Sequence, residues 1–209
     1  MNIHRDKIVG WIGAYAAVLT ENKSHLTDLD SAIGDGDHGV NMDRGFRAVS
    51  EKLISVSEDD IGAVFKTVAM TLISTVGGAS GPLYGTFFLK MGMATVGKLE
   101  LTLDDWISAV ESGIDGVIQR GKANPGDKTM VDSLLPALES LKGAAKDGKN
   151  VAEALAGSAE AAERGMKDTI PLVAKKGRAS YLGERSAGHQ DPGATSSYLL
   201  FKTAAQVLA

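Results

Sequence analysis

The chain lacks cysteine, long apolar runs and clusters of basic residues. Its 209 residues contain no cysteine and five prolines, and aromatic residues make up 5% of the chain. Without cysteine no disulfide can form, which fits a cytoplasmic protein. No apolar stretch approaches the roughly 20 residues of a membrane-spanning helix. The first residues carry charges and lack a signal-peptide core, so we expect the protein in the cytoplasm with no membrane partner.

Positive charge is nowhere concentrated along the sequence. The 22 lysines and arginines are outnumbered by 26 acidic residues, which gives a formal net charge of -4. Binding to nucleic acid needs a concentrated basic face, so no nucleic-acid partner is expected. The hydrophobic fraction of 44% and the charged fraction of 23% are those of a folded globular protein. No linker divides the chain, and we expect one domain over residues 1–209.

Apolar residues recur at helical spacing in eight segments, and no stretch alternates as a strand would. The first helix is expected from Ile3 to about Thr20, and the last from Pro192 to near Leu208. The sequence therefore predicts an all-α domain, an eight-helix antiparallel up-and-down barrel or bundle. Further helix starts are expected at capping residues or proline, at residues 57–60, Pro82, Thr102 and Asn150.

Glycine-rich connections alternate with plain polar ones along the chain. The glycine-rich connections cover residues 34–39, 76–82, 121–129 and 169–193. Alternate connections of an up-and-down bundle lie at the same end, so these four are expected to meet there. Every second helix would also begin at that end, with unpaired N–H groups and the positive ends of the helix dipoles. Such an arrangement favours an anion, above all phosphate.

The first of these connections is rich in acids. Four aspartates fall between Asp28 and Asp37, and glycines at 34, 36 and 39 let the backbone turn sharply. Clustered carboxylates are hard oxygen ligands for Mg²⁺ or Ca²⁺. A solvated acidic loop is the plain alternative. An EF-hand fails because Phe46 stands where a glutamate is required, and a dinucleotide fingerprint fails because no strand precedes it. We interpret the segment as a magnesium site serving a phosphate.

The second and third connections offer backbone and polar groups. Residues 77–81 present bare backbone and the Ser80 hydroxyl, although a plain helix–helix turn would have the same composition. The third is not a P-loop, because Asp127 is inserted in the pattern and a helix precedes it. Its Lys122 and Lys128 could steer phosphates.

The fourth connection is long for a compact domain, as lids and binding loops are. Arg178 and Arg185 are suited to phosphate. A phosphohistidine is conceivable at His38, but a phosphate contact or support of the metal ligands explains this residue more simply. His189 is the other histidine in these connections. No Ser-His-Asp pattern or acid–base pair is present, which fits phosphoryl transfer by positioning and charge stabilisation.

Taken together, residues 34–42, 74–86, 120–130 and 177–196 closely resemble the L subunits of bacterial dihydroxyacetone kinases. The resemblance spans nearly the whole chain, with the four motifs in the same order. It implies an eight-helix antiparallel barrel with the nucleotide site at one end. It also implies two Mg²⁺ ions on Asp30, Asp35 and Asp37, bridging the phosphates of tightly bound ADP or ATP.

The resemblance implies nucleotide contacts in all four connections and no catalytic side chain. The implied nucleotide-binding residues are His38, Gly39, Val40, Asn41, Ala79, Ser80, Gly121, Met130, Arg178, Asp191, Pro192 and Gly193.

In this family the enzyme is divided among subunits. The K subunit holds dihydroxyacetone, and in the phosphoenolpyruvate-dependent branch a phosphohistidine of the M subunit phosphorylates ADP on the L subunit. A separate short chain resembles that branch, so K and M subunits are the expected partners. Two alternatives stay open: phosphorylation of another acceptor, and nucleotide-dependent regulation of a transcription activator.

Overall fold

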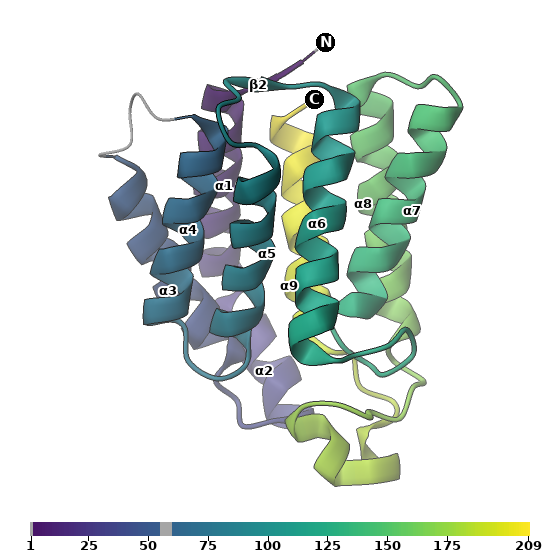
Figure 1. The fold of residues 1–209 in the computed structure, drawn as a ribbon. Coiled ribbons are helices and arrows are strands. Elements are labelled where there is room, and N and C mark those ends of the chain that lie inside the picture. Colours follow the sequence, from purple (N-terminus) through teal and green to yellow (C-terminus); the bar gives the residue numbers. More distant parts are fainter. Residues whose placement is uncertain (1, 55–59) are drawn as a thin grey trace.

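The computed structural model describes residues 2–54 and 60–209, and these residues are predominantly helical, as predicted. Long helices run lengthwise through the molecule, and the two termini lie together at the upper end in Figure 1. No helix among the described residues is both long and apolar enough to cross a membrane. The helices are α1 (Arg5–Glu21), α2 (Lys23–Ile33), α3 (His38–Leu53), α4 (Ile61–Thr75), α5 (Ser80–Ala94), α6 (Leu103–Gly121), α7 (Val131–Lys146), α8 (Val151–Asp168), the 3-10 helix η1 (Arg178–Ser186) and α9 (Pro192–Val207).

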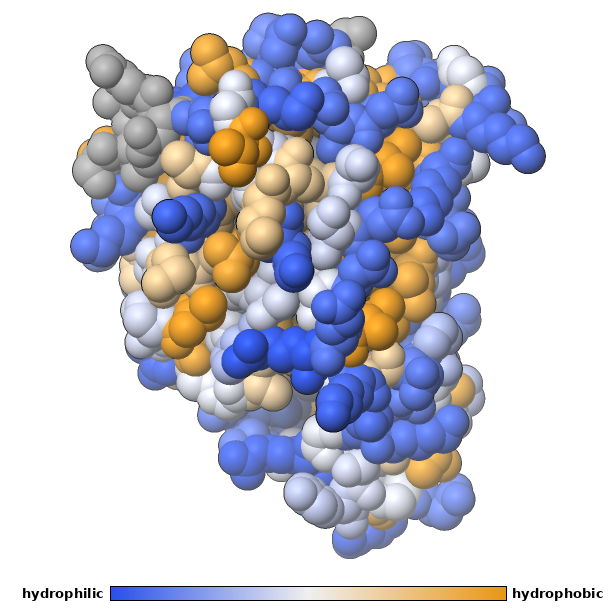
Figure 2. Space-filling view, in the orientation of Figure 1, coloured by the Kyte–Doolittle hydropathy of each residue, from blue (hydrophilic) through white to orange (hydrophobic). Residues whose placement is uncertain are grey.

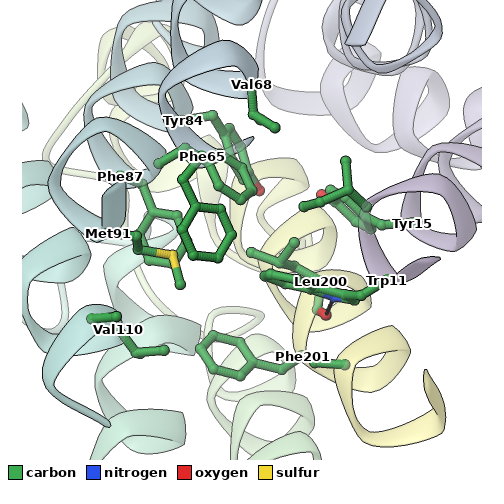
Figure 3. Close-up of a cluster of buried hydrophobic side chains, with 14 of the residues drawn as sticks. Trp11, Tyr15, Phe65, Val68, Tyr84, Phe87, Met91, Val110, Leu200 and Phe201 are labelled. Carbon is green, nitrogen blue, oxygen red and sulfur yellow. Dashed lines mark hydrogen bonds between the residues drawn. The ribbon is translucent and has the colours of Figure 1, made fainter. Parts of the chain in front are cut away.

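Within residues 2–54 and 60–209, eight long helices form a closed ring. From α3 to α9 each helix packs against the next one along the chain, and α1 packs against both α3 and α9. Aromatic side chains, Trp11 and Phe65 among them, fill the interior (Figure 3). The Trp11 ring lies 6.3 Å from that of Phe65 and 5.2 Å from that of Trp106, both edge to face. The Trp11 indole N–H donates to the Leu200 carbonyl at 3.1 Å. This hydrogen bond satisfies the polar atom of a buried side chain.

Polar side chains dominate the lower end of the face seen in Figure 2, where η1 lies, whereas apolar side chains are scattered over α4, α5 and α6. The lower end carries the functional residues described below.

The sequence did not predict three features: helix α2, a pair of short strands and the 3-10 helix η1. Helix α2 has only 11 residues, and it lies below the ring where a connection was expected. Residues Ile3–His4 form β1, which pairs antiparallel with β2 (Glu100–Leu101), so α1 begins at Arg5 rather than Ile3. Two-residue strands are too short to show periodicity. The third element, η1, lies inside the long fourth connection.

The helix starts differ between the two ends of the ring. At the upper end, Asp60, Thr102 and Asn150 cap α4, α6 and α8 with their side chains, as predicted for the last two. The proposed start at Ser57 lies outside the described residues, and α5 begins at Ser80 rather than Pro82. At the lower end, within the described chain, the N-cap residues of α3, α5 and α7 make no side-chain cap. The first N–H of α3, from His38, is accepted by the Asp30 carboxylate, and that of α7, from Val131, by the Thr129 hydroxyl, whereas the start of α5 faces the lower end.

Candidate functional site

A cavity of about 400 Å³ opens at the lower end of the ring. All four glycine-rich connections line it, together with the first residues of α3, α5, α7 and α9. The volume is that of a small-molecule site. The four glycine-rich connections therefore lie together, as their alternation along the sequence predicted.

The cavity is suited to an anion because four helix N-termini meet there. Three of these helices begin without a side-chain cap in the described structure. In the second connection Gly78 adopts a left-handed conformation, with φ +65°. A Cβ on Gly81, at the start of α5, would overlap the Val76 carbonyl. These glycines allow the tight turn that brings backbone N–H groups to the cavity.

Three of the acidic residues form a compact cluster on the cavity wall. Carboxylate oxygens of Asp30, Asp35 and Asp37 lie within 4.8 Å of one another, whereas Asp28 is exposed on α2 and outside the cluster. The Asp30 carboxylate accepts hydrogen bonds from the backbone N–H groups of Asp37, at 2.8 Å, and His38, at 3.1 Å. These bonds fix its orientation.

The cluster is suited to a divalent metal. A Cβ at Gly34 would overlap the Asp30 carboxylate, so this position needs glycine for the carboxylate to keep its place. Carboxylate oxygens such as these three are hard donors, the kind of ligand that Mg²⁺ prefers.

The fourth connection closes over this cluster. A guanidinium nitrogen of Arg178 lies 3.0 Å from a carboxylate oxygen of Asp35. Gly177, just before Arg178, has φ +64° and turns the chain at that point. The positive charge reduces the repulsion among the aspartates. Arg185, by contrast, is exposed and does not line the cavity.

His38 lies in the cavity wall but is already engaged through both ring nitrogens. Its Nδ1 lies 3.0 Å from the Ser80 hydroxyl and its Nε2 2.9 Å from the Ser196 hydroxyl. Burial lowers the pKa of His38, which keeps the ring neutral. The geometry favours a role in orienting Ser80 over a phosphohistidine. His189, the other suspected histidine, is exposed.

Asp191 caps α9 at the back of the cavity. Its carboxylate accepts the Ala194 N–H at 2.7 Å. Burial is the main cause that raises the pKa of Asp191 to about 7. The carboxylates of Asp132 and Asp30 act in the same direction, and the Ala194 N–H and Lys128 oppose it. Asp191 is therefore largely neutral in mildly acidic solution.

The two lysines of the third connection differ in burial: Lys128 is buried, and Lys122 is exposed. The Lys128 side chain is 1% exposed and its ammonium contacts backbone carbonyls. Lys128 lines the cavity, but its ammonium is held by these carbonyls, so a role in steering phosphates stays a prediction. Lys122 is exposed and lies outside the cavity lining.

The structure brings nine of the twelve nucleotide-binding candidates to the cavity. The candidates that line it are His38, Ala79, Ser80, Gly121, Met130, Arg178, Asp191, Pro192 and Gly193. Gly39, Val40 and Asn41 lie outside the lining. A Cβ on Gly39 would overlap the Lys23 carbonyl of α2, Val40 is exposed, and the Asn41 side chain accepts a hydrogen bond from Arg44 at 2.7 Å.

Sequence reasoning missed the apolar part of the lining. In the sequence these residues are indistinguishable from core positions of amphipathic helices, and only the fold shows that they face a cavity. They include Leu83, Tyr84, Val117 and Val131.

The sequence matches the DAK2 domain over residues 32–206. The chain belongs to the DAK2 domain family. It is 50% identical over 196 residues to a relative from Escherichia coli K12, the ADP-binding subunit of its PEP-dependent dihydroxyacetone kinase. The match covers 94% of this chain and 93% of the relative.

Another relative of this DAK2 domain protein is the L-erythrulose kinase of Pectobacterium atrosepticum. It is 31% identical over 199 residues, which are 94% of this chain and 34% of the relative. Among solved structures, the dihydroxyacetone kinase of C. freundii in complex with AMP-PNP and Mg²⁺ matches with a TM-score of 0.71 and 27% identity. This chain aligns over 99% of its length and spans about a third, 34%, of that kinase.

Proposed function

We propose that the chain is the ADP/ATP-binding subunit of a PEP-dependent dihydroxyacetone kinase. The observation that carries the proposal is the 50% identity, over 94% of one chain and 93% of the other, to the E. coli ADP-binding subunit. The relative has nearly the same length, so the likeness extends to a separate subunit rather than to a fused kinase.

The residues around the cavity support this assignment. Asp30, Asp35 and Asp37 would hold Mg²⁺, which neutralises phosphate charge and orients the transferred group. Arg178 and the backbone N–H groups at the start of α5 would bind the phosphates. The purine would lie against the apolar wall that includes Leu83.

The chain would act between two partner subunits. We infer that a phosphohistidine on an M subunit transfers its phosphoryl group to ADP in this cavity. The ATP formed would then phosphorylate dihydroxyacetone bound to a K subunit. Within the described residues the functional groups gather at one open end of the ring, which leaves the cavity mouth accessible to each partner in turn.

A second acceptor is favoured by one observation. The Pectobacterium relative is an L-erythrulose kinase, and this chain matches only 34% of its length. If the acceptor is held by another polypeptide, this chain would serve either hydroxy-ketone equally.

Two experiments test the proposal. Purified protein denatured with acid should release ADP or ATP, identified by chromatography and mass spectrometry. Protein stripped of nucleotide should bind Mg-ADP in calorimetry and lose this binding when the metal is chelated. The proposal fails if no nucleotide is released and the stripped protein does not bind Mg-ADP. Reconstitution with K and M subunits of a relative, comparing dihydroxyacetone with erythrulose, identifies the acceptor.

A further inference from the structure

The segment from Thr169 to Asp191 leaves the ring and returns to it at nearly the same place. At its base the Gly188 N–H donates to the Ile170 carbonyl at 2.8 Å, and the Asp191 N–H donates to the Thr169 hydroxyl at 3.0 Å. Between these two points lies η1, which carries Arg178 to the cavity (Figure 1). The segment is thus a loop with a narrow base.

A buried ammonium group lies at this base. Lys128 Nζ donates to the carbonyls of Thr169 at 2.8 Å, Leu172 at 3.0 Å and His189 at 2.5 Å. The Ile170 carbonyl lies farther away, at 3.4 Å. An ammonium has three N–H bonds, so the three nearest carbonyls use all of them. Two of these carbonyls belong to the segment that leaves the ring and one to the segment that returns to it, so the lysine links the two segments.

The position is electrostatically suited to a cation. Thr169 follows the last residue of α8, where backbone carbonyls have no partner within the helix and the helix dipole is negative. A positive charge there satisfies those carbonyls. The hydrogen bonds in turn offset the cost of burying the ammonium, because each of its N–H bonds has an acceptor.

The backbone at Lys128 is one that a lysine seldom adopts. Its φ is +62°, in the left-handed region that favours glycine. The Asp132 carboxylate holds this turn by accepting the N–H groups of Gly126 and Thr129. Because the backbone does not favour lysine, the ammonium contacts give the physical reason for a lysine at this position.

We propose that Lys128 is a positioning residue whose buried charge fixes the base of the 169–191 loop and thereby slows the departure of bound nucleotide. The proposal rests on the proposed function for its second half. Its first half concerns the loop alone. The lysine acts through Arg178 and the other loop residues of the cavity wall, not by contacting the ligand.

Limited proteolysis tests the first half without nucleotide. Trypsin can cut the loop at Lys175, Lys176, Arg178 and Arg185, and the fragments are counted by mass spectrometry. In Lys128→Met we expect cleavage about tenfold faster than in the wild type, the effect of losing hydrogen bonds to a charged group. Lys128→Arg, which keeps the charge, should lie closer to the wild type.

Lys122→Met is the matched control. Lys122 lies in the same connection, also has a positive φ of +50°, and is exposed. Its replacement should leave loop cleavage within about twofold of the wild type. Cleavage of Lys128→Met at the wild-type rate would overturn the proposal, as would equal acceleration in the Met and Arg variants.

Dissociation of a fluorescent ADP analogue with Mg²⁺ tests the second half. We expect release about tenfold faster from Lys128→Met than from Lys122→Met, with helical circular dichroism unchanged. If the wild type binds no nucleotide, the proposed function fails, whereas the proteolysis result still decides the role of Lys128. Unchanged release alongside faster cleavage would refute the link from loop to nucleotide.

Hydrogen exchange in the wild type covers the case in which Lys128→Met does not fold. The Gly188 and Lys175 amides donate to the carbonyls of Ile170 and Asp127 and should exchange at least about a hundredfold more slowly than the amide of Tyr181, an exposed residue in η1. Exchange of all three at similar rates would show that the base is not fixed, and would overturn the proposal.

Discussion

Arg178 lies 3.0 Å from Asp35, so the cation of the fourth connection contacts a carboxylate of the acidic cluster. The same carboxylate belongs to the group suited to a metal ion. The guanidinium and a divalent cation would therefore compete for Asp35, and the guanidinium is free for phosphate once the metal is bound.

Replacing Arg178 with methionine should strengthen the binding of a divalent cation alone. Without its competitor, the cluster is expected to bind Mn²⁺ several-fold more tightly, measured by electron paramagnetic resonance of free Mn²⁺. The Arg178 side chain is 67% exposed, so its ion pair adds little to stability and the melting temperature should hardly change. Arg185→Met is the control, and equal Mn²⁺ affinity in both variants would contradict the competition.

Asparagine at Asp35 or Asp37 should abolish metal-dependent nucleotide binding while leaving the fold intact, because each substitution removes a charged metal ligand. Calorimetry with Mg-ADP measures the loss. Asp28→Asn is the control, since Asp28 is exposed outside the cluster. Wild-type binding in both cluster variants would mean that the metal lies elsewhere.

Asp30→Asn should also lower stability. The Asp30 carboxylate accepts two backbone N–H groups at the start of α3. Weakening these charge-assisted bonds should reduce the free energy of unfolding by about 1 kcal/mol, comparable to losing a helix cap. Urea denaturation should show this decrease in Asp30→Asn but not in Asp35→Asn.

Asp191 should make stability depend on pH. Its carboxyl has a pKa of about 7 in the folded protein and near 3.8 when unfolded. Because the folded-state pKa is raised, the protonated form is favoured by folding. The stabilisation of the folded state by the protonated carboxyl is complete below about pH 4 and is lost as pH rises toward 7. Relative to Asp191→Asn, the wild type should lose about 1.4 kcal/mol of unfolding free energy per pH unit between these values.

Urea denaturation at several pH values measures this difference. The asparagine amide oxygen can still accept the Ala194 N–H, so the variant keeps the helix cap. Asp147→Asn, on the exposed upper end, should follow the wild type at every pH. A constant difference between Asp191→Asn and the wild type would show that the buried carboxyl does not titrate as described.

Two glycine-to-alanine substitutions should differ in effect: one should weaken nucleotide binding, and the other should raise stability. In Gly34→Ala the new Cβ would overlap the Asp30 carboxylate, so metal-dependent nucleotide binding should fall at least about tenfold. In Gly143→Ala, on an open face of α7, no atom lies within 4 Å of the new Cβ. That variant should gain about 0.5–1 kcal/mol of stability and bind nucleotide normally. Calorimetry and urea denaturation separate the two effects.

The sequence by itself determined the class of fold and the end at which the site lies. Helical periodicity and capping pairs such as Asn150 with Glu153 are local, so they appear in the sequence without knowledge of the fold. The alternation of glycine-rich and polar connections then placed the site, because antiparallel neighbours return every second connection to the same end.

Only the tertiary structure decided which residues meet at that end and in what state. It closed the ring by packing α9 on α1, placed Leu83 in the cavity wall, and left Val40 outside it. It also buried Lys128 among carbonyls distant in sequence, where the lysine was expected to steer phosphate. Burial and contacts between distant residues depend on how the helices pack, and a local sequence pattern does not contain that information.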